Sequence, residues 1–314
     1  MMVAHRLRSQ GIKATLIEQG AIPGGRVTTH HEDGATFDIG AQFITTRERI
    51  FRSIVEKWVT EGIVKPWYKG PLGNMRYVGV DGMSSVAKHL SKDLNIIHSE
   101  TATHIHFSNG EWTVTTSAPN APKKINHHTA NFLVVSIPVP KALQLIDDSN
   151  VQLDFDEEDE LRKITYSKCI TALTRLAGPS GLPNPGAMDL NLDALRWLGD
   201  NSTKGISKVD GCLTISSSPR FAAAYWDAPE EQYLPLMMNA SKPFIRADIV
   251  SATSHKWEFS EPTRIYKEKQ PFRENYLVDA SNNLAMCGDG FAGGRLEAAA
   301  MSGYSLGEEL IRAV

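Results

Sequence analysis

The residues of this 314-residue chain that are best suited to bind a ligand are found near its two ends. Glu18 is followed closely by Gly24-Gly25-Arg26, and Gly288-Asp289 lies close to the C-terminus. A carboxylate accepts hydrogen bonds from sugar hydroxyls, and paired glycines let the backbone approach a ligand without interference from Cβ. Arginine offers planar donors to phosphate. These residue types therefore suit a ligand that carries both sugar and phosphate.

The residues before Glu18 predict the elements that position its carboxylate. Met2, Val3 and Leu7 form an apolar stripe at near-helical spacing, and Gly11 stands where such a helix would end. Residues 12–18 then read as a short strand ending in an acid. A helix followed by an acid-tipped strand is typical of the second half of a dinucleotide-binding βαβ unit, in which the acid binds a ribose. The glycine motif expected about 20 residues earlier would fall at or before Met1, so we expect it to be absent from this chain.

Two further motifs extend this pattern. Residues 36–43 read Thr-Phe-Asp-Ile-Gly-Ala-Gln-Phe, and residues 284–287 predict a buried strand that runs into the turn Gly288-Asp289. A helix of small residues is expected from about Leu296, and its N-terminus would suit an anionic or electron-rich ligand. Motifs at opposite ends of the chain are therefore expected to serve a single cofactor.

Taken together, these motifs resemble the FAD-binding region of the flavin amine oxidase superfamily. Gly40-Ala41-Gln42-Phe43 and the residues that follow it are similar to the renalase-like branch in particular. The resemblance implies FAD as the cofactor and places Gln42 and Phe43 on the face toward substrate and flavin. The cofactor-binding residues that it implies, Ala102 by position alone, are Glu18, Gly24, Gly25, Arg26, Gly40, Ala41, Ala102, Gly288, Asp289, Arg295 and Leu296.

The predicted fold class is α/β, with a Rossmann-type FAD-binding domain that lacks its first strand and glycine loop, and a substrate domain built on an antiparallel sheet. Residues 1–45, 79–145 and 272–314 are expected to form the FAD domain, and residues 46–78 and 146–271 the substrate domain. Between the terminal motifs, residues 96–97, 102–107, 112–115 and 131–138 predict strands, and a helix is expected after the turn at Gly82.

Composition excludes several other classes. A net charge of −3 offers no general attraction for nucleic acid, and no apolar run reaches the roughly 18 residues of a membrane span. Three widely separated cysteines favour a reducing, cytoplasmic location over a disulfide framework. The pairs His30-His31 and His127-His128 are expected in polar loops, where neighbouring side chains point apart, so no metal site is predicted.

The resemblance implies an oxidase that removes a hydride from a small reduced molecule, either an amine or a dihydronicotinamide, with dioxygen as the electron acceptor. Such chemistry needs alignment of a C–H bond with the flavin more than it needs a protein base. The alternative is a truncated, FAD-poor remnant or an incomplete gene model, in which the strand at residues 12–18 would lose a neighbour. The sequence leaves these alternatives, the substrate and the oligomeric state open.

Overall fold

The structure is a computed structural model that describes residues 1–119, 121–270 and 274–313. The chain forms two compact units, each assembled from separate segments. Unit 1 comprises Met1–Pro23, Leu90–Thr165 and Glu261–Val314, and unit 2 comprises Gly24–His89 and Tyr166–Ser260. The division into an FAD domain and a substrate domain stays a prediction, because units defined by contacts are not functional domains.

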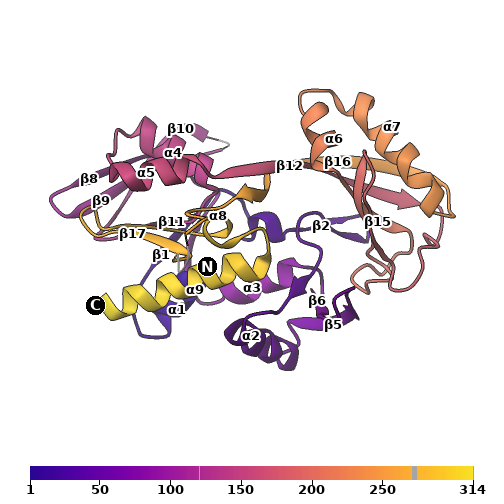
Figure 1. Cartoon of the computed structure of the whole chain (residues 1–314), viewed down its shortest axis with the longest axis horizontal. Helices are drawn as coiled ribbons and strands as arrows, with labels where there is room; N and C mark the ends of the chain where they lie inside the picture. The colour runs from indigo at the N-terminus through magenta and orange to yellow at the C-terminus, as the bar shows by residue number, and fades with distance from the viewer. Residues whose placement is uncertain (120, 271–273, 314) are drawn as a thin grey trace. The chain divides into compact units, whose positions relative to one another are not determined.

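Unit 1 is built around short parallel strands of the kind found in dinucleotide-binding domains (Figure 1). One pair is β1 with β7, and a second sheet has the order β11-β18-β17, in which β11 and β18 are parallel. Among the described strands, β1 pairs with β7 alone. The elements of this part are α1 (Met2–Arg8), β1 (Thr15–Glu18), β7 (Asn95–His98), β11 (Leu133–Val135), β17 (Tyr276–Asp279), β18 (Leu284–Cys287), α8 (Asp289–Ala292) and α9 (Leu296–Ala313).

These elements confirm the helix, the acid-tipped strand and the terminal strand and helix that the sequence predicts, with two corrections to length. The predicted strand at residues 12–18 begins only at Thr15, and the one at residues 131–138 is limited to Leu133–Val135. Gly11 has a φ of +75°, the left-handed conformation expected where the chain leaves α1.

The helices α1 and α9 pack together through glycine. A Cβ added at Gly307 would lie 2.8 Å from Cβ of Arg6, and one at Gly303 would lie 3.1 Å from Cβ of Met2. Val3 and Leu7 then reach the apolar core of unit 1, which they share with residues of β18 and α9. The small residues of α9 therefore let α1 approach closely enough to cover the sheet.

A three-stranded antiparallel meander completes unit 1, with β9 between β8 and β10. The polar loop predicted for His127-His128 is wrong: both residues lie in β10, which the sequence reading missed because its residues are mostly polar. Nε2 of His128 donates to the carboxylate of Glu100 at 2.8 Å, so His128 contributes a polar contact to this sheet. The remaining elements are β8 (Thr101–Ser108), β9 (Glu111–Ala118), β10 (Ala121–Ala130), α4 (Val139–Asp148) and α5 (Phe155–Arg162).

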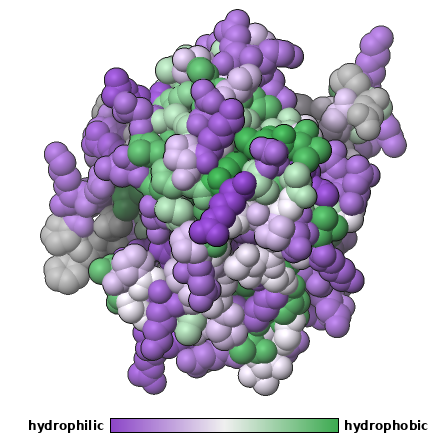
Figure 2. Space-filling model, turned by 90° about the vertical axis from the view of Figure 1, so that its right-hand side faces the viewer, coloured by the Kyte–Doolittle hydropathy of each residue, from purple (hydrophilic) through white to green (hydrophobic). Residues whose placement is uncertain are grey.

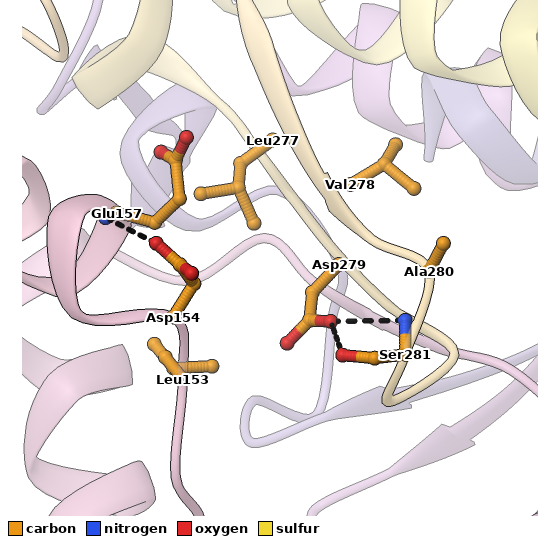
Figure 3. A pocket seen from close by; sticks show the side chains of 8 residues that line it. All are labelled: Leu153, Asp154, Glu157, Leu277, Val278, Asp279, Ala280 and Ser281. Atoms are coloured by element: carbon orange, nitrogen blue, oxygen red, sulfur yellow. Dashed lines mark hydrogen bonds between the residues drawn. The ribbon is translucent and has the colours of Figure 1, made fainter.

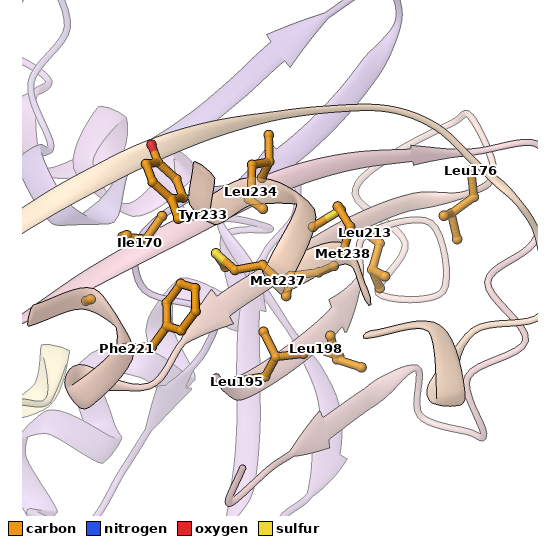
Figure 4. Close-up of a cluster of buried hydrophobic side chains, with 13 residues drawn as sticks. Ile170, Leu176, Leu195, Leu198, Leu213, Phe221, Tyr233, Leu234, Met237 and Met238 are labelled. Carbon is orange, nitrogen blue, oxygen red and sulfur yellow. The ribbon is translucent and has the colours of Figure 1, made fainter. Parts of the chain in front are cut away.

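Unit 2 contains three sheets, the largest of which has five strands in the order β13-β14-β15-β12-β16. The pairings β13–β14, β14–β15 and β15–β12 are all antiparallel, which confirms the predicted antiparallel sheet. The helices α6 and α7 bury apolar residues against this sheet in the cluster of Figure 4. The elements are β12 (Thr165–Leu176), β13 (Ala187–Asp189), β14 (Leu195–Asp200), β15 (Cys212–Ser217), α6 (Pro219–Ala224), α7 (Glu230–Ser241), η2 (Lys242–Phe244) and β16 (Ile249–Arg264).

The two smaller sheets of unit 2 are formed by residues 29–79, close to Gly24-Gly25-Arg26 in sequence and including the motif at residues 36–43. One pairs β2 with β3, and the other has the order β4-β6-β5. His30 and His31 lie in β2, so the polar loop predicted for them is also wrong. The elements are η1 (Gly25–Val27), β2 (Thr29–Glu32), β3 (Ala35–Asp38), β4 (Ile44–Thr45), α2 (Arg49–Thr60), β5 (Val64–Lys69), β6 (Met75–Gly79) and α3 (Ser84–Ser91).

The face shown in Figure 2 carries both hydrophilic and hydrophobic residues, and many of the hydrophobic ones gather in its upper part. Within the described residues, no helix combines the length and the apolar character needed to cross a bilayer.

The close approach of α1 and α9 gives a first prediction. Replacing Gly307 with Val should lower the free energy of unfolding by about 2 kcal/mol, because the added side chain meets Arg6 and overpacks the contact. Glu309→Val is the matched control, since it adds the same β-branched side chain at a half-exposed position of the same helix. Equal urea midpoints for the two variants would show that the helices do not need glycine there.

Candidate functional site

Glu18 ends β1 in unit 1, where a dinucleotide-binding fold places its ribose-binding acid. Its Oε1 accepts a hydrogen bond from the backbone N–H of Gly20 at 2.7 Å. That bond orients the carboxylate at the strand end. Ala102, predicted from position alone, lies in β8 of the same unit and is half-buried.

The C-terminal motif forms a tight turn between β18 and α8, also in unit 1. Gly288 has a φ of +133°, which a side chain rarely tolerates, and its N–H donates to Ser302 Oγ at 2.8 Å. Asp289 opens α8 and is buried, with 7% of its surface exposed. The backbone of Gly293 closes the turn by donating to the carbonyl of Asp289 at 2.7 Å.

The segment that follows begins α9 at Leu296. Arg295 lies just before the helix, with its Nε 4.0 Å from Oε2 of the almost fully buried Glu297.

In unit 2 the structure brings two predicted motifs into direct contact. The backbone N–H of Ala41 donates to the carbonyl of Arg26 at 2.9 Å, so Gly24-Gly25-Arg26 and the Gly40 segment lie against each other. A Cβ on Gly40 would fall well inside van der Waals contact with that same carbonyl oxygen. Gly40 is therefore required by the crossing of the two backbones. Gly25, with a φ of +52°, turns the chain just before Arg26.

Arg26 itself is held within unit 2. Its Nη1 donates to the carbonyl of Ser260 at 3.1 Å, and its guanidinium lies 5.8 Å from the ring centre of Tyr166. These contacts fix the direction of a side chain for which the sequence predicts phosphate binding. Contact between Arg26 and a phosphate stays a prediction.

Asp38, in the middle of the Gly40 motif, makes several buried polar contacts in unit 2. Its Oδ2 accepts from Nζ of Lys204 at 2.5 Å, and both side chains are fully buried. Its Oδ1 accepts from Thr29 Oγ1 and from the backbone N–H of Met83, each at 2.7 Å. The carboxylate thus ties together β2, β3, the start of α3 and the segment after β14.

Burial lowers the pKa of Lys204, since the charged ammonium loses its hydration, and the carboxylate of Asp38 opposes that shift. Sequence reasoning missed Lys204, because it lies in a polar stretch without a recognisable spacing. The only signal for Asp38 was its place inside the motif. Only the fold, which brings together residues 166 positions apart, could reveal the pair.

The predicted residue Gln42 is oriented by the backbone of the same motif. Its Nε2 donates to the carbonyls of Asp38 at 2.6 Å and Gly40 at 3.0 Å, so the amide nitrogen must face these acceptors. The amide oxygen then points away from these carbonyls, is buried and has no hydrogen-bond partner among the described residues. The same holds for Nε1 of Trp197, and a Cβ on Gly199 would lie 2.7 Å from this nitrogen and 3.3 Å from Oε1 of Gln42.

Beside Gln42, three aromatic rings surround one arginine, in what we call the Arg76 cage: Arg76, Phe43, Tyr68 and Trp197. The carbon at the centre of the guanidinium lies 4.1 Å from the ring centre of Phe43, 5.0 Å from that of Tyr68 and 5.7 Å from that of Trp197. Phe43 and Trp197 also contact each other, with their ring centres 5.6 Å apart. The sequence predicted Phe43 on the face toward substrate and flavin, and it gave no signal for Arg76.

A separate cavity of about 240 Å³ lies in unit 1 (Figure 3). Its carboxylates are engaged in local structure: Asp154 accepts from backbone N–H groups that begin α5, and Asp279 accepts from Ser281. None of the predicted site residues lines it. The lining residues are Leu153, Asp154, Glu157, Leu277, Val278, Asp279, Ala280 and Ser281. Across the part of the chain that the structure describes, no three or more His, Cys, Asp or Glu side chains group as metal ligands would.

Comparison with known proteins agrees with this architecture. Residues 1–58 match the family model of an NAD(P)-binding Rossmann-like domain. A putative protoporphyrinogen oxidase from Exiguobacterium sp. 255-15 superposes with a TM-score of 0.72 at 11% identity, covering 100% of this chain and 96% of the other. Putrescine oxidase bound to putrescine superposes with a TM-score of 0.69 at 12% identity, covering 99% and 96%.

The class that the fold defines follows from these matches. The chain has a mixed α/β fold with a Rossmann-like NAD(P)-binding domain and antiparallel sheets, and this fold is similar to those of the protoporphyrinogen oxidase and putrescine oxidase structures. Identities of 11–12% establish the likeness of fold alone.

The contact between the two N-terminal motifs can be tested through Gly40. Gly40→Ala should destabilise the protein by about 3 kcal/mol, because the new methyl group must displace the backbone at Arg26. Gly178→Ala is the control, since no atom lies within 4 Å of a Cβ built there. Chemical denaturation of both variants measures the difference. A loss at Gly40 no larger than at Gly178 would mean that the motifs do not cross as described.

The buried ion pair can be tested by removing one charge or both. Lys204→Met should cost about 3–5 kcal/mol, because the carboxylate of Asp38 is left buried without its cation. Adding Asp38→Asn removes the stranded charge but keeps an acceptor for Thr29 and Met83, so the double variant should unfold at a higher denaturant concentration than Lys204→Met. A double variant less stable than the single one would contradict this account.

Proposed function

We propose that this protein is an FAD-dependent oxidoreductase, an oxidase that removes a hydride from a small reduced substrate such as an amine or a dihydronicotinamide. The observation that carries the proposal is the agreement of two independent lines. The sequence motifs resemble the FAD-binding region of flavin amine oxidases, and the fold is similar to oxidases of that type. The renalase-like branch is the finer assignment that we propose from residues 40–47.

Each motif has a defined task in this proposal. Glu18 binds the ribose hydroxyls, Asp289 binds a hydroxyl of the ribityl chain, and the start of α9 with Arg295 faces the anionic or electron-rich part of FAD. Gly24, Gly25 and Arg26 supply backbone and guanidinium donors. The required close packing of Gly40 on Arg26 supports a rigid loop for this purpose.

The substrate side is assigned to Gln42 and Phe43. The amide of Gln42 is locked by two backbone carbonyls, and such orientation suits a group that must hold a substrate against a ring. Bound FAD would supply the hydride acceptor, and dioxygen would reoxidise it. The protein would then contribute binding, alignment and exclusion of water rather than an acid–base pair.

The direct test is to purify the protein, titrate it with FAD and record the visible flavin absorbance of the complex. We expect a stoichiometric complex, and Asp289→Ala should weaken FAD binding about ten- to a hundredfold by removing an acceptor for a cofactor hydroxyl. Asp193→Ala, which removes an almost fully exposed carboxylate, is the control and should bind FAD as the original protein does. A protein that takes up no FAD, or an Asp289 variant with unchanged affinity, would refute the proposal.

A further inference from the structure

The Arg76 cage has the composition of a site that binds cations. Aromatic rings attract a positive charge to their faces, and groups of such rings bind ammonium ligands in proteins. Here three ring centres lie within 6 Å of one guanidinium carbon. The charge that fills this cage belongs to the chain itself.

Arg76 is held firmly in that position. Only 11% of its side chain is exposed, its Nη1 donates to the hydroxyl of Tyr68, and its Nη2 donates to Asp189 at 3.0 Å. The strand β6, which carries Arg76, pairs with both β4 and β5, so the backbone behind the guanidinium is fixed from two sides. A ligand would have to break these contacts to replace the guanidinium.

The polar groups beside the cage also favour a bound molecule that is uncharged. Nε1 of Trp197 is a buried donor and Oε1 of Gln42 a buried acceptor, and neither atom has a hydrogen-bond partner in the part of the chain that the structure describes. An ammonium group offers donors alone and would leave the Trp197 N–H without an acceptor. Lys204 has its Nζ 5.4 Å from the ring centre of Trp67, a ring whose centre lies 6.4 Å from that of Trp197, and the charge of Lys204 is already matched by Asp38.

We propose that Arg76 is a specificity-determining residue that excludes cationic amines from the face formed by Gln42, Phe43 and Trp197. This inference rests on the proposed function, because that function assigns Gln42 and Phe43 to the substrate side. A substrate that carries an ammonium group meets a like charge and finds the aromatic faces occupied. The face therefore selects substrates that are uncharged where they contact it. Of the two substrate classes in the proposed function, this favours a dihydronicotinamide over a cationic amine.

The test uses benzylammonium as the probe and calorimetry as the readout, so it does not depend on flavin. The original protein should bind benzylammonium weakly, and Arg76→Gln should bind it at least about tenfold more tightly, since the ring faces become available. Arg220→Gln is the matched control: it removes the same charge from an exposed side chain and should leave the weak binding unchanged.

Two results would overturn the inference: an original protein that binds benzylammonium as tightly as Arg76→Gln does, or a folded Arg76→Gln that gains no affinity. If that variant does not fold, NMR of the original protein decides. The Nε–H resonance of Arg76 should show a ring-current shift that persists when benzylammonium is added, and an unshifted or displaced resonance contradicts an occupied cage. Failure of the protein to bind FAD would instead refute the proposed function and leave these binding results standing.

Discussion

The carboxylate of Asp38 and its buried partner Lys204 hold unit 2 together where the candidate substrate residues lie. Taking both charges out of water is costly, and the contact is stable only because the ion pair is close and Asp38 accepts further hydrogen bonds from Thr29 and Met83. The carbonyl of the same residue accepts from Gln42, which fixes the amide beside the aromatic cage. The position of Gln42 is therefore linked to the charge pair through the backbone of Asp38.

Close packing at two glycines, Gly40 and Gly199, also determines the surroundings of Gln42. Gly40 allows the loop of Arg26 to pass against it. Gly199 leaves space beside Nε1 of Trp197 and Oε1 of Gln42, two atoms without a hydrogen-bond partner among residues 1–119, 121–270 and 274–313. Glycine at these positions is a steric requirement of the fold, whereas the unpaired atoms are not needed for folding and cost free energy. Such groups are expected where a protein recognises another molecule.

The sequence predicted the fold class, the acid-tipped strand that ends at Glu18 and the turn at Asp289, because each depends on local periodicity and on glycine at a defined place. It failed for His30-His31 and His127-His128, whose polar residues hide strands that are stabilised by neighbours in their sheets. It could not reveal Lys204, because the buried ion pair exists only after distant segments meet.

The central claim is that Glu18 and Asp289, which both lie in unit 1 although they are 271 positions apart in sequence, serve one FAD molecule. A crystal structure of the protein with FAD tests it most directly. We expect the carboxylates of Glu18 and Asp289 to contact hydroxyl groups of the same cofactor molecule. A complex in which only one of the two carboxylates contacts FAD, or in which neither does, would contradict the claim.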